Sequence, residues 1–489
     1  MVNKKELKAL IEPHFYNDLK KDEYSVENVE ANKLLTNTRL DLAFKLLFLD
    51  LLRRNAEHAK KIYEINISAC GFGKFKEIGN LKKNSFEAFT EDFIRTYKSI
   101  NTYGFDSNKT LLPLSFNGSI ANGAHRVASA IHCNKTVDCV KIETRDHIQD
   151  YNFFYQRNVS YEILDEVVTK FIEYAPNVHI AFIWPTAYGK DKQIDNIIPN
   201  IVYKKEVHLN LNGAHNLLSQ IYFGEDWLGG VENNFKGVRG KLVECFKTFN
   251  PVRVIAFQAD NLDSVFSVKD DIRSLFKVGK HSVHITDSKE EAVRSARIMF
   301  NDNSIHFLNY AKPNKYISAH KNIQEYKNFL RKNGLIVDEA VLDGGMVLSV
   351  YGLRESNDID YLSLNNSKIL YPNENIDNHE EQLAFHSEEK KELIFNPKFY
   401  FYFNDIKLIS FSQLYNMKIK RAENKDKNDC GVMEALIENN KFKGIISNFK
   451  QRLYYVKART RQAVVYLIKL IGFYDRAKSI YHSVKKKNG

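Results

Sequence analysis

Cysteine is scarce in this sequence, and no two cysteines have the spacing of a zinc site. The five that occur are odd in number and include no Cys-x-x-Cys pair: Cys70, Cys133, Cys139, Cys245 and Cys430. This pattern disfavours a disulfide-stapled domain and a cysteine-rich metal site, and it favours a reducing, cytoplasmic environment. Long apolar runs are missing as well, because no stretch approaches the roughly 18 consecutive apolar residues of a spanning helix. The first thirty residues also lack the apolar centre of a signal peptide, so we expect neither a membrane span nor a cleaved leader.

Proline and glycine are few, at 9 and 22 of 489 residues, whereas Tyr and Phe number 26 and 33. This composition excludes a disordered chain and a collagen-like repeat. At about 150 residues per domain, the length suits two to four domains. Strand and helix signals alternate, so we expect a multidomain α/β (α+β) protein. The expected divisions are a helical N-terminal region, a strand–helix module, a central α/β segment, a mixed-sheet domain and a helical tail, at residues 1–65, 66–150, 151–310, 311–437 and 438–489.

Several elements can be predicted from periodicity. Apolar-rich helical patterns are expected in the ranges 6–10, 40–52 and 322–332. Runs of apolar and β-branched residues predict buried strands in the ranges 179–184, 252–257 and 282–285. Ser288 and Glu291 have the spacing of a capping box that opens a helix through Met299.

The positive charge is concentrated near the end of the sequence. Eleven Lys and Arg against one Asp from Lys450 onward account for +10 of the net charge of +11, so no broad nucleic-acid groove is expected elsewhere. Apolar and aromatic residues alternate with these charges, a pattern typical of amphipathic helices lying on an anionic membrane surface. Two alternatives are a helix packed on the protein with its charged face in solvent, and a contact to RNA or DNA.

The clearest chemical pattern is a diglycine followed by paired carboxylates. Gly344 and Gly345 end a predicted strand and let the backbone approach a phosphate closely. A short helix and a loop follow, and a second strand carries Asp358 and Asp360, whose side chains are expected to share one face. Two carboxylates on one face repel each other unless a cation lies between them, and Mg²⁺ is the natural candidate. The alternative is an ordinary tight turn followed by solvated acidic residues.

This order of residues resembles the nucleotidyltransferase-fold superfamily, in the branch that includes minimal nucleotidyltransferases and abortive-infection toxins. The resemblance covers about 100 residues and includes the wording Tyr-Gly-x-Arg-x-Ser-x-Asp-x-Asp. It implies that the diglycine, with Arg354 and Ser356 of the loop, binds nucleotide phosphates, and that Asp358 and Asp360 hold Mg²⁺. A third carboxylate on a later strand usually activates the acceptor in that superfamily, and Asp405 is the candidate here.

A basic helix follows the candidate strands. Lys418, Arg421 and Lys425 recur at three- and four-residue spacing, so they are expected to share one helical face that clamps a triphosphate. The combination of Lys418, Arg421 and Lys425-Asp426 also matches the signature that often closes nucleotidyltransferase-like domains. A surface helix with ordinary solvated charges is the alternative.

A second phosphate-binding pattern lies in the N-terminal third. An Asn117-Gly118 turn, the segment Asn122-Gly-Ala-His-Arg126, an Ala-rich helix and a strand at 137–142 follow one another. This order resembles the ParB/sulfiredoxin fold, whose members grip nucleotide phosphates with this turn. The resemblance implies phosphate contacts from Gly123, His125 and Arg126 at a helix N-terminus. Alternatively, His125 and Arg126 only cap the helix and pair with nearby acidic groups.

Together these patterns predict a Mg²⁺-dependent nucleotidyl- or phosphotransferase that uses a nucleoside triphosphate and a small-molecule or glycan acceptor. By resemblance, its place is bacterial capsule or lipopolysaccharide biosynthesis, in the cytoplasm or peripherally at the inner face of the membrane. Two alternatives remain: a nucleotidyltransferase toxin of the abortive-infection type, and a non-catalytic nucleotide-binding scaffold.

Overall fold

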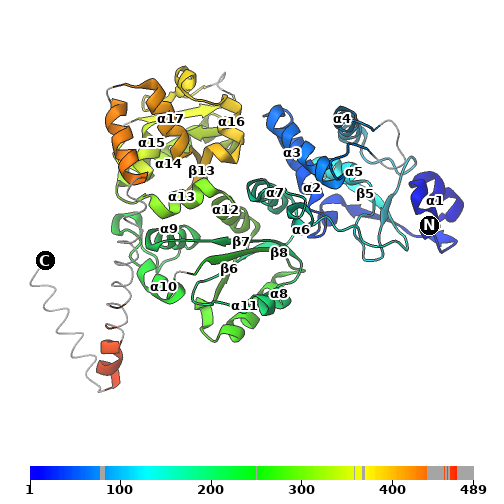
Figure 1. Ribbon diagram of the computed structural model, residues 1–489, viewed down its shortest axis with the longest axis horizontal. Helices are drawn as coiled ribbons and strands as arrows, with labels where there is room; N and C mark the ends of the chain where they lie inside the picture. The colour runs from blue at the N-terminus through cyan, green and yellow to red at the C-terminus, as the bar shows by residue number, and fades with distance from the viewer. Residues whose placement is uncertain are drawn as a thin grey trace, which may run out of the picture.

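The chain is a mixed α/β protein, as expected, with three units that follow one another along the sequence (Figure 1). The computed structural model describes residues 1–76, 83–248, 250–356, 358–365, 369–423, 425–437, 456, 460 and 463–470. Buried apolar side chains from all three units form one continuous cluster. Among the described residues, no helix has both the length and the apolar character needed to cross a bilayer.

The N-terminal unit contains a three-stranded sheet in the order β3-β5-β4 and a two-stranded pair, β1-β2. Its strands are β1 (Val2–Asn3), β2 (Glu23–Tyr24), β3 (Val26–Glu30), β4 (Leu112–Leu114) and β5 (Thr136–Lys141). Its helices are α1 (Lys4–Leu10), α2 (Asp41–Leu51), α3 (Ala56–Cys70), α4 (Phe86–Tyr103), α5 (Ala124–His132) and two 3₁₀ turns, η1 (Pro13–Asp18) and η2 (Ala31–Leu34).

The order β4-α5-β5 is the strand–helix–strand order expected from the sequence, and β4 runs parallel to β5. The predicted boundary at residue 65 falls inside this unit, because β3 pairs antiparallel with β5 over its whole length. Residues 1–65 are therefore not a separate helical region. They supply one strand of the same sheet.

The central unit is a four-stranded antiparallel sheet in the order β7-β8-β6-β9. Its strands are β6 (Val178–Ile183), β7 (Ile201–Val207), β8 (Val252–Gln258) and β9 (Val283–Ile285). Its helices are α6 (Tyr151–Tyr155), α7 (Tyr161–Tyr174), α8 (Asp191–Ile197), α9 (Leu211–Ile221), α10 (Val238–Cys245), α11 (Leu262–Phe276), α12 (Lys289–Met299), α13 (Asp302–Tyr310) and the 3₁₀ turns η3 (Val231–Asn233) and η4 (Gly279–His281).

Both faces of the central sheet are buried. Along β6, Ile180 and Phe182 belong to the main apolar cluster, whereas Ala181 and Ile183 belong to a second cluster on the opposite face. Successive side chains of a strand point to opposite faces, so a strand covered on both sides needs an unbroken apolar run. This is why β6 could be predicted from its sequence.

The C-terminal unit is built on a five-stranded mixed sheet in the order β12-β11-β10-β14-β13. Its strands are β10 (Ala340–Leu342), β11 (Ile359–Ser363), β12 (Ile376–Asn378), β13 (Tyr400–Phe403) and β14 (Ile406–Ile409). Its helices are α14 (Ile317–Lys332), α15 (Gly345–Val350), α16 (Lys390–Phe395), α17 (Phe411–Arg421) and the 3₁₀ turns η5 (Val337–Glu339), η6 (His379–Phe385) and η7 (Pro397–Phe399). β10 is antiparallel to β11 and parallel to β14.

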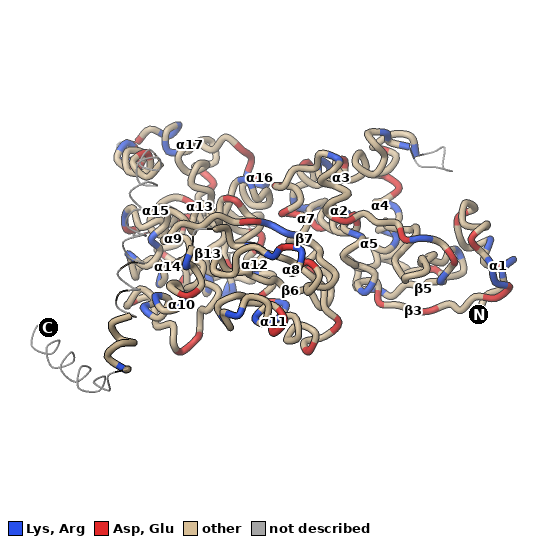
Figure 2. Tube along the Cα trace, turned by 60° about the horizontal axis from the view of Figure 1, so that its bottom comes forward, with Lys and Arg blue, Asp and Glu red and all other residues tan. Residues whose placement is uncertain are grey.

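Charged residues of both signs are interleaved along all three units (Figure 2). The basic tail predicted at residues 438–489 lies almost entirely outside the described residues, which include only 456, 460 and 463–470 of it. Its membrane contact therefore stays a prediction.

A lysine is buried where the three units meet. Lys407 of β14 is 3% exposed, and its ammonium donates to the backbone carbonyls of Asp338 and Ile394. Burial lowers the pKa of Lys407 to about 7, although the carboxylate of Asp338 opposes the shift. The folded protein therefore releases this proton at a pH well below that of a lysine in the unfolded chain.

Stability should consequently rise with pH above 7. Between pH 7 and the ordinary lysine pKa, the unfolded state binds more protons than the folded state, so alkaline pH favours folding. From pH 6 to 9, the unfolding free energy of the wild type should increase by about 2 to 3 kcal/mol more than that of Lys407→Met. Urea denaturation at both pH values measures this difference. The exposed Lys398→Met should behave like the wild type, and parallel pH profiles for wild type and Lys407→Met would contradict the expectation.

Candidate active site at the diglycine turn

The diglycine turn follows β10 directly and lies against the start of β11. Gly344 has a φ of +59°, a left-handed conformation that favours glycine, and a Cβ there would overlap Oδ2 of Asp360. A Cβ on Gly345 would likewise overlap Oγ of Ser356. The two glycines therefore allow the carboxylate strand and the loop before it to approach the turn closely. The backbone N–H of Asp343 donates to the carbonyl of Asp360 at 2.8 Å and holds the strand in this position.

The paired carboxylates lie next to this turn. Asp358 is exposed, and the Asp360 side chain is 17% exposed. The hydroxyl of Ser356 donates to Oδ1 of Asp358 at 3.0 Å, which orients that carboxylate. Burial raises the pKa of Asp360, His379 opposes the shift, and the carboxylates of Asp358, Asp343 and Asp377 raise the pKa further. Negative charge is therefore concentrated around Asp360.

Asp343 and two histidines extend the cluster inward. Asp343 is fully buried, and its Oδ2 is 2.9 Å from Nδ1 of His379 and 3.0 Å from Nε2 of His386. Burial alone would raise the pKa of Asp343, but the hydrogen bonds from both histidines outweigh burial and lower it well below its usual range. The other ring nitrogen of His379 lies 3.9 Å from Oδ2 of Asp360, so His379 joins the buried carboxylate to the pair.

Sequence reasoning missed these three residues and Asp377. Asp343 directly precedes the diglycine, and this adjacency is the signal that could have identified it. Asp377 is on β12, opposite Asp360 in the parallel pairing of β11 and β12. Strand β12 has only three residues, so nothing in its own sequence pattern predicts a strand.

A chain of ion pairs connects the loop after α15 with the end of α17. The Arg354 guanidinium forms two bonds to Asp429, at 2.7 and 3.1 Å. The Lys418 ammonium is 2.8 Å from Asp429 and 3.0 Å from Asp426. Arg421 completes the chain with bonds of 2.9 and 2.8 Å to Asp426. We call these five residues the ion-pair chain. It brings the predicted phosphate ligands Arg354, Lys418 and Arg421 into the same part of the unit as the diglycine turn.

The structure departs from the basic helical face predicted for Lys418, Arg421 and Lys425. Helix α17 ends at Arg421, so Lys425 lies beyond it and pairs instead with Glu423 at 3.3 Å. Lys418 is 1% exposed and already has two carboxylate partners. The arrangement gives Lys418 a role in holding the unit together, and phosphate binding by Lys418 and Arg421 stays a prediction.

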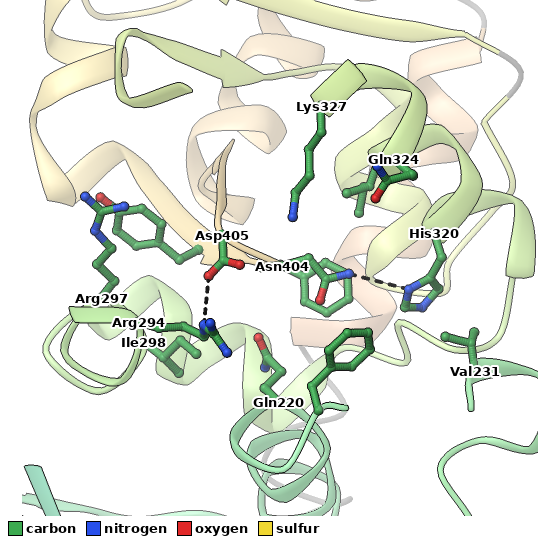
Figure 3. A pocket seen from close by; sticks show the side chains of 14 residues that line it. Gln220, Val231, Arg294, Arg297, Ile298, His320, Gln324, Lys327, Asn404 and Asp405 are labelled. Atoms are coloured by element: carbon green, nitrogen blue, oxygen red, sulfur yellow. Dashed lines mark hydrogen bonds and ion pairs between the residues drawn. The ribbon is translucent and has the colours of Figure 1, made fainter. Parts of the chain in front are cut away.

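Asp405 lies away from this cluster. It precedes β14, which runs parallel to β10 with Leu408 level with Leu342, so Asp405 is at the end of the sheet opposite the diglycine turn. Its carboxylate faces Arg294, with Nε at 3.2 Å from Oδ1 (Figure 3). The structure therefore does not bring Asp405 to Asp358 and Asp360. The sequence could not show this, because the order of strands in the sheet decides it.

The residues of the second predicted motif are at the start of α5 in the N-terminal unit. Gly123 has a φ of +90°, and a Cβ there would overlap the Leu112 side chain. Arg126 forms an ion pair with Glu12 at 2.7 Å, and the Tyr63 hydroxyl contacts Nε2 of His125 at 2.8 Å. Burial lowers the pKa of His125 well below its ordinary value. The ion pair of Arg126 agrees with the pairing alternative, whereas His125 contacts a tyrosine and no described side chain caps α5. Phosphate binding at this turn stays a prediction.

The oxygen donors at the diglycine turn suit a hard divalent cation. Oδ1 of Asp343 is buried without a hydrogen-bond partner in the described part of the chain, and the neighbouring carboxylates raise the pKa of Asp360. A cation bound here would give Oδ1 of Asp343 a partner and would stabilise the charged form of Asp360. The described residues contain no closed group of three or more His, Cys, Asp or Glu side chains arranged for a metal. Mg²⁺ commonly takes only one or two protein carboxylates and completes its shell with phosphate and water.

Substituting Gly344 tests how tightly the turn is built. Gly344→Ala adds a Cβ that overlaps Asp360 and imposes a left-handed φ on a non-glycine residue. We expect the unfolding free energy to fall by about 1 to 3 kcal/mol. Gly431→Ala is the matched control, because a Cβ at Gly431 meets no atom within 4 Å. Equal stability of the two variants in urea denaturation would show that the turn tolerates a side chain.

No protein-family model, no curated protein and no solved structure matches this chain. The functional argument therefore depends on the geometry of the site.

Proposed function

We propose that the C-terminal unit is a Mg²⁺-dependent nucleotidyl- or phosphotransferase. The observation that carries the proposal is the concentration of carboxylates around Asp360, next to a turn that only glycine can form without overlap. Such a site combines strong negative charge with a backbone that a phosphate group can approach closely. A divalent cation and a nucleoside triphosphate together would balance that charge.

Asp358 and Asp360 would hold the cation, which when bound polarises the phosphoryl group and neutralises charge on the phosphate oxygens. Ser356 orients Asp358 through its hydroxyl, and Nε2 of His379 lies 3.9 Å from Oδ2 of Asp360 on the buried side. The diglycine backbone lies against the triphosphate, and the exposed part of Arg354 offers it positive charge. The acceptor hydroxyl attacks phosphorus and releases either pyrophosphate, for attack at the α position, or a nucleoside diphosphate, for attack at the γ position.

A proton acceptor for that hydroxyl is also available. Asp377 is exposed on β12 and pairs in register with Asp360, so both side chains project from the same face. Neighbouring strands are about 4.8 Å apart, which places the Asp377 carboxylate beside the pair. We assign Asp377, rather than Asp405, the role of the third carboxylate.

The acceptor is proposed to be a small molecule or glycan of bacterial capsule or lipopolysaccharide assembly, in the cytoplasm or at the inner face of the membrane. This part of the proposal depends on the resemblance described above and on the Lys- and Tyr-rich tail.

A non-catalytic nucleotide-binding scaffold is the second candidate. The position of Asp405 at the opposite end of the sheet favours it, because the carboxylate predicted to activate the acceptor is remote. The two candidates differ in one measurable respect. A thermal-shift screen of nucleoside triphosphates with Mg²⁺ detects binding in both cases, because a ligand of the native state raises its stability. Release of pyrophosphate or nucleoside diphosphate in the presence of acceptor is expected only for the transferase.

A further inference from the structure

A cavity of about 240 Å³ lies between the central and C-terminal units, at the end of the sheet opposite the diglycine turn (Figure 3). Helices α9 and α12 of the central unit form one wall, and α14 and the β13–β14 hairpin form the other. The cavity is thus built by segments far apart in the sequence. None of the residues proposed for the diglycine site lines it.

In the described part of the chain, one cation that lines the cavity forms no ion pair with a carboxylate. Lys327 extends from α14 into the cavity, and the described residues give its ammonium no ion pair (Figure 3). The other cations are already neutralised, since Arg294 pairs with Asp405 and Arg297 pairs with Glu173 and Asp338. Burial lowers the pKa of Lys327, and the neighbouring Arg294 lowers it further, against the opposing effect of Asp405. An anion next to Lys327 would offset this cost of burial.

Amide groups supply hydrogen-bond acceptors around Lys327. The side-chain NH₂ groups of Gln220 and Gln324 each donate a hydrogen bond to a protein oxygen, at 3.4 and 3.3 Å. The side-chain NH₂ group of Asn404 lies 3.5 Å from a histidine ring nitrogen. Within the described chain, none of their three carbonyl oxygens accepts a hydrogen bond. Carbonyl oxygens of this kind accept from hydroxyl groups.

The contact of Asn404 is made to His320. Nε2 of His320 lies 3.1 Å from two oxygens, the carbonyl of Pro313 and Oδ1 of Asn314, so Nε2 carries the proton. Nδ1 is therefore the acceptor for the Asn404 amide, as the dashed line in Figure 3 marks. This fixes the amide nitrogen of Asn404 on His320 and leaves its oxygen for a ligand.

Aromatic rings complete the wall. Phe223, Tyr402 and Phe403 line the cavity beside these polar groups. Rings next to amides and a cation match a molecule that has C–H faces, hydroxyl groups and an anionic group. The volume lies below the roughly 300–1,000 Å³ of sites for drug-sized ligands, so the ligand is smaller than a nucleoside triphosphate.

We propose that this cavity binds a small phosphomonoester of a sugar or polyol. The phosphate lies at Lys327, the hydroxyl groups donate to the carbonyl oxygens of Gln220, Gln324 and Asn404, and the carbon skeleton packs on the aromatic rings. Because the ligand bridges α9 and α14, it joins the central and C-terminal units. This site is separate from the proposed transferase site, and its test does not depend on transferase activity.

Isothermal titration calorimetry on the full chain tests the proposal. The probes are glucose 1-phosphate, ribose 5-phosphate and glycerol 3-phosphate, with glucose, glycerol and inorganic phosphate as controls. At least one phosphomonoester should bind, and Lys327→Met should weaken its binding tenfold or more. Lys321→Met, an exposed lysine on the same helix, and the variant Asp358→Asn with Asp360→Asn should both bind as the wild type does.

Each other result overturns a stated part of the proposal. Failure of all three phosphomonoesters to bind the wild type, or unchanged binding by a folded Lys327→Met, rejects the site. Equal affinity for inorganic phosphate rejects the role of the amides and rings, and equal affinity for glucose or glycerol rejects the role of Lys327. If Lys327→Met does not fold, Asn404→Ala and Gln324→Ala replace it, and each is expected to weaken phosphomonoester binding without affecting binding of inorganic phosphate.

Discussion

Replacing Asp358 and Asp360 together by asparagine is expected to reduce Mg²⁺-dependent transfer from a nucleoside triphosphate by about 1,000-fold or more. Asparagine keeps the shape of each side chain but removes the charge that would hold the cation. The fold should persist, because Asp358 is exposed and Asp360 makes no close ion pair with a lysine or arginine in the described part of the chain. Removing the charge should in fact relieve the repulsion around Asp360.

Three measurements define this result. Turnover is followed as release of pyrophosphate or nucleoside diphosphate, nucleotide binding as a Mg²⁺-dependent thermal shift, and folding as the unfolding free energy. Glu374→Gln is the control, since Glu374 is an exposed carboxylate of the same unit. Unchanged turnover in the double variant would refute the site, whereas a wild type that binds nucleotide without any turnover would establish the scaffold.

Replacing Lys418 by methionine is expected to lower the unfolding free energy by about 3 to 5 kcal/mol. Lys418 is 1% exposed and lies between Asp426 and Asp429. Removing one partner of a buried ion pair leaves the other charge without compensation, which costs far more than the pair contributes. In this variant the side chains of Arg354 and Arg421 still lie next to the two carboxylates. The decrease in unfolding free energy should therefore be near the lower limit of this range.

Lys425→Met is the matched control from the same predicted motif. Lys425 is 64% exposed and, among the described residues, forms an ion pair with Glu423 alone. Exposed pairs of this kind contribute about 0 to 1 kcal/mol. Urea denaturation of both variants distinguishes the two roles proposed for Lys418. A Lys418→Met variant of normal stability that binds nucleotide weakly would make it a phosphate ligand, and the ion-pair chain would then not be a structural element.

The elements that could be predicted are those whose neighbours impose a simple pattern. Strands β6, β8 and β9 agree with the predicted ranges within about two residues, because most of their residues are apolar and buried. Helix α12 begins where its cap predicts, with the Ser288 hydroxyl accepting from Glu291 N–H at 3.1 Å. The Glu291 carboxylate accepts from Asp287 instead of Ser288, so the reciprocal half of the capping box is absent.

The site was predicted in part for the same reason. The diglycine, Ser356 and the two carboxylates are close in sequence, and the antiparallel pairing of the successive strands β10 and β11 brings them together. Asp377, His379 and His386 reach the site through the order of strands in the sheet, which no local pattern encodes. Asp405 shows the converse: its sequence position suits a third carboxylate, but β14 enters the sheet from the other end.

The ion-pair chain also defines how long the C-terminal folding unit must be. Its two anions, Asp426 and Asp429, come after the last residue of α17, whereas its three cations come before them. A fragment cut at Arg421 would contain the whole five-stranded sheet and still leave three positive charges without these two carboxylates, one of them on the buried Lys418. The smallest autonomous version of this unit therefore extends past the final strand and helix, at least as far as Asp429.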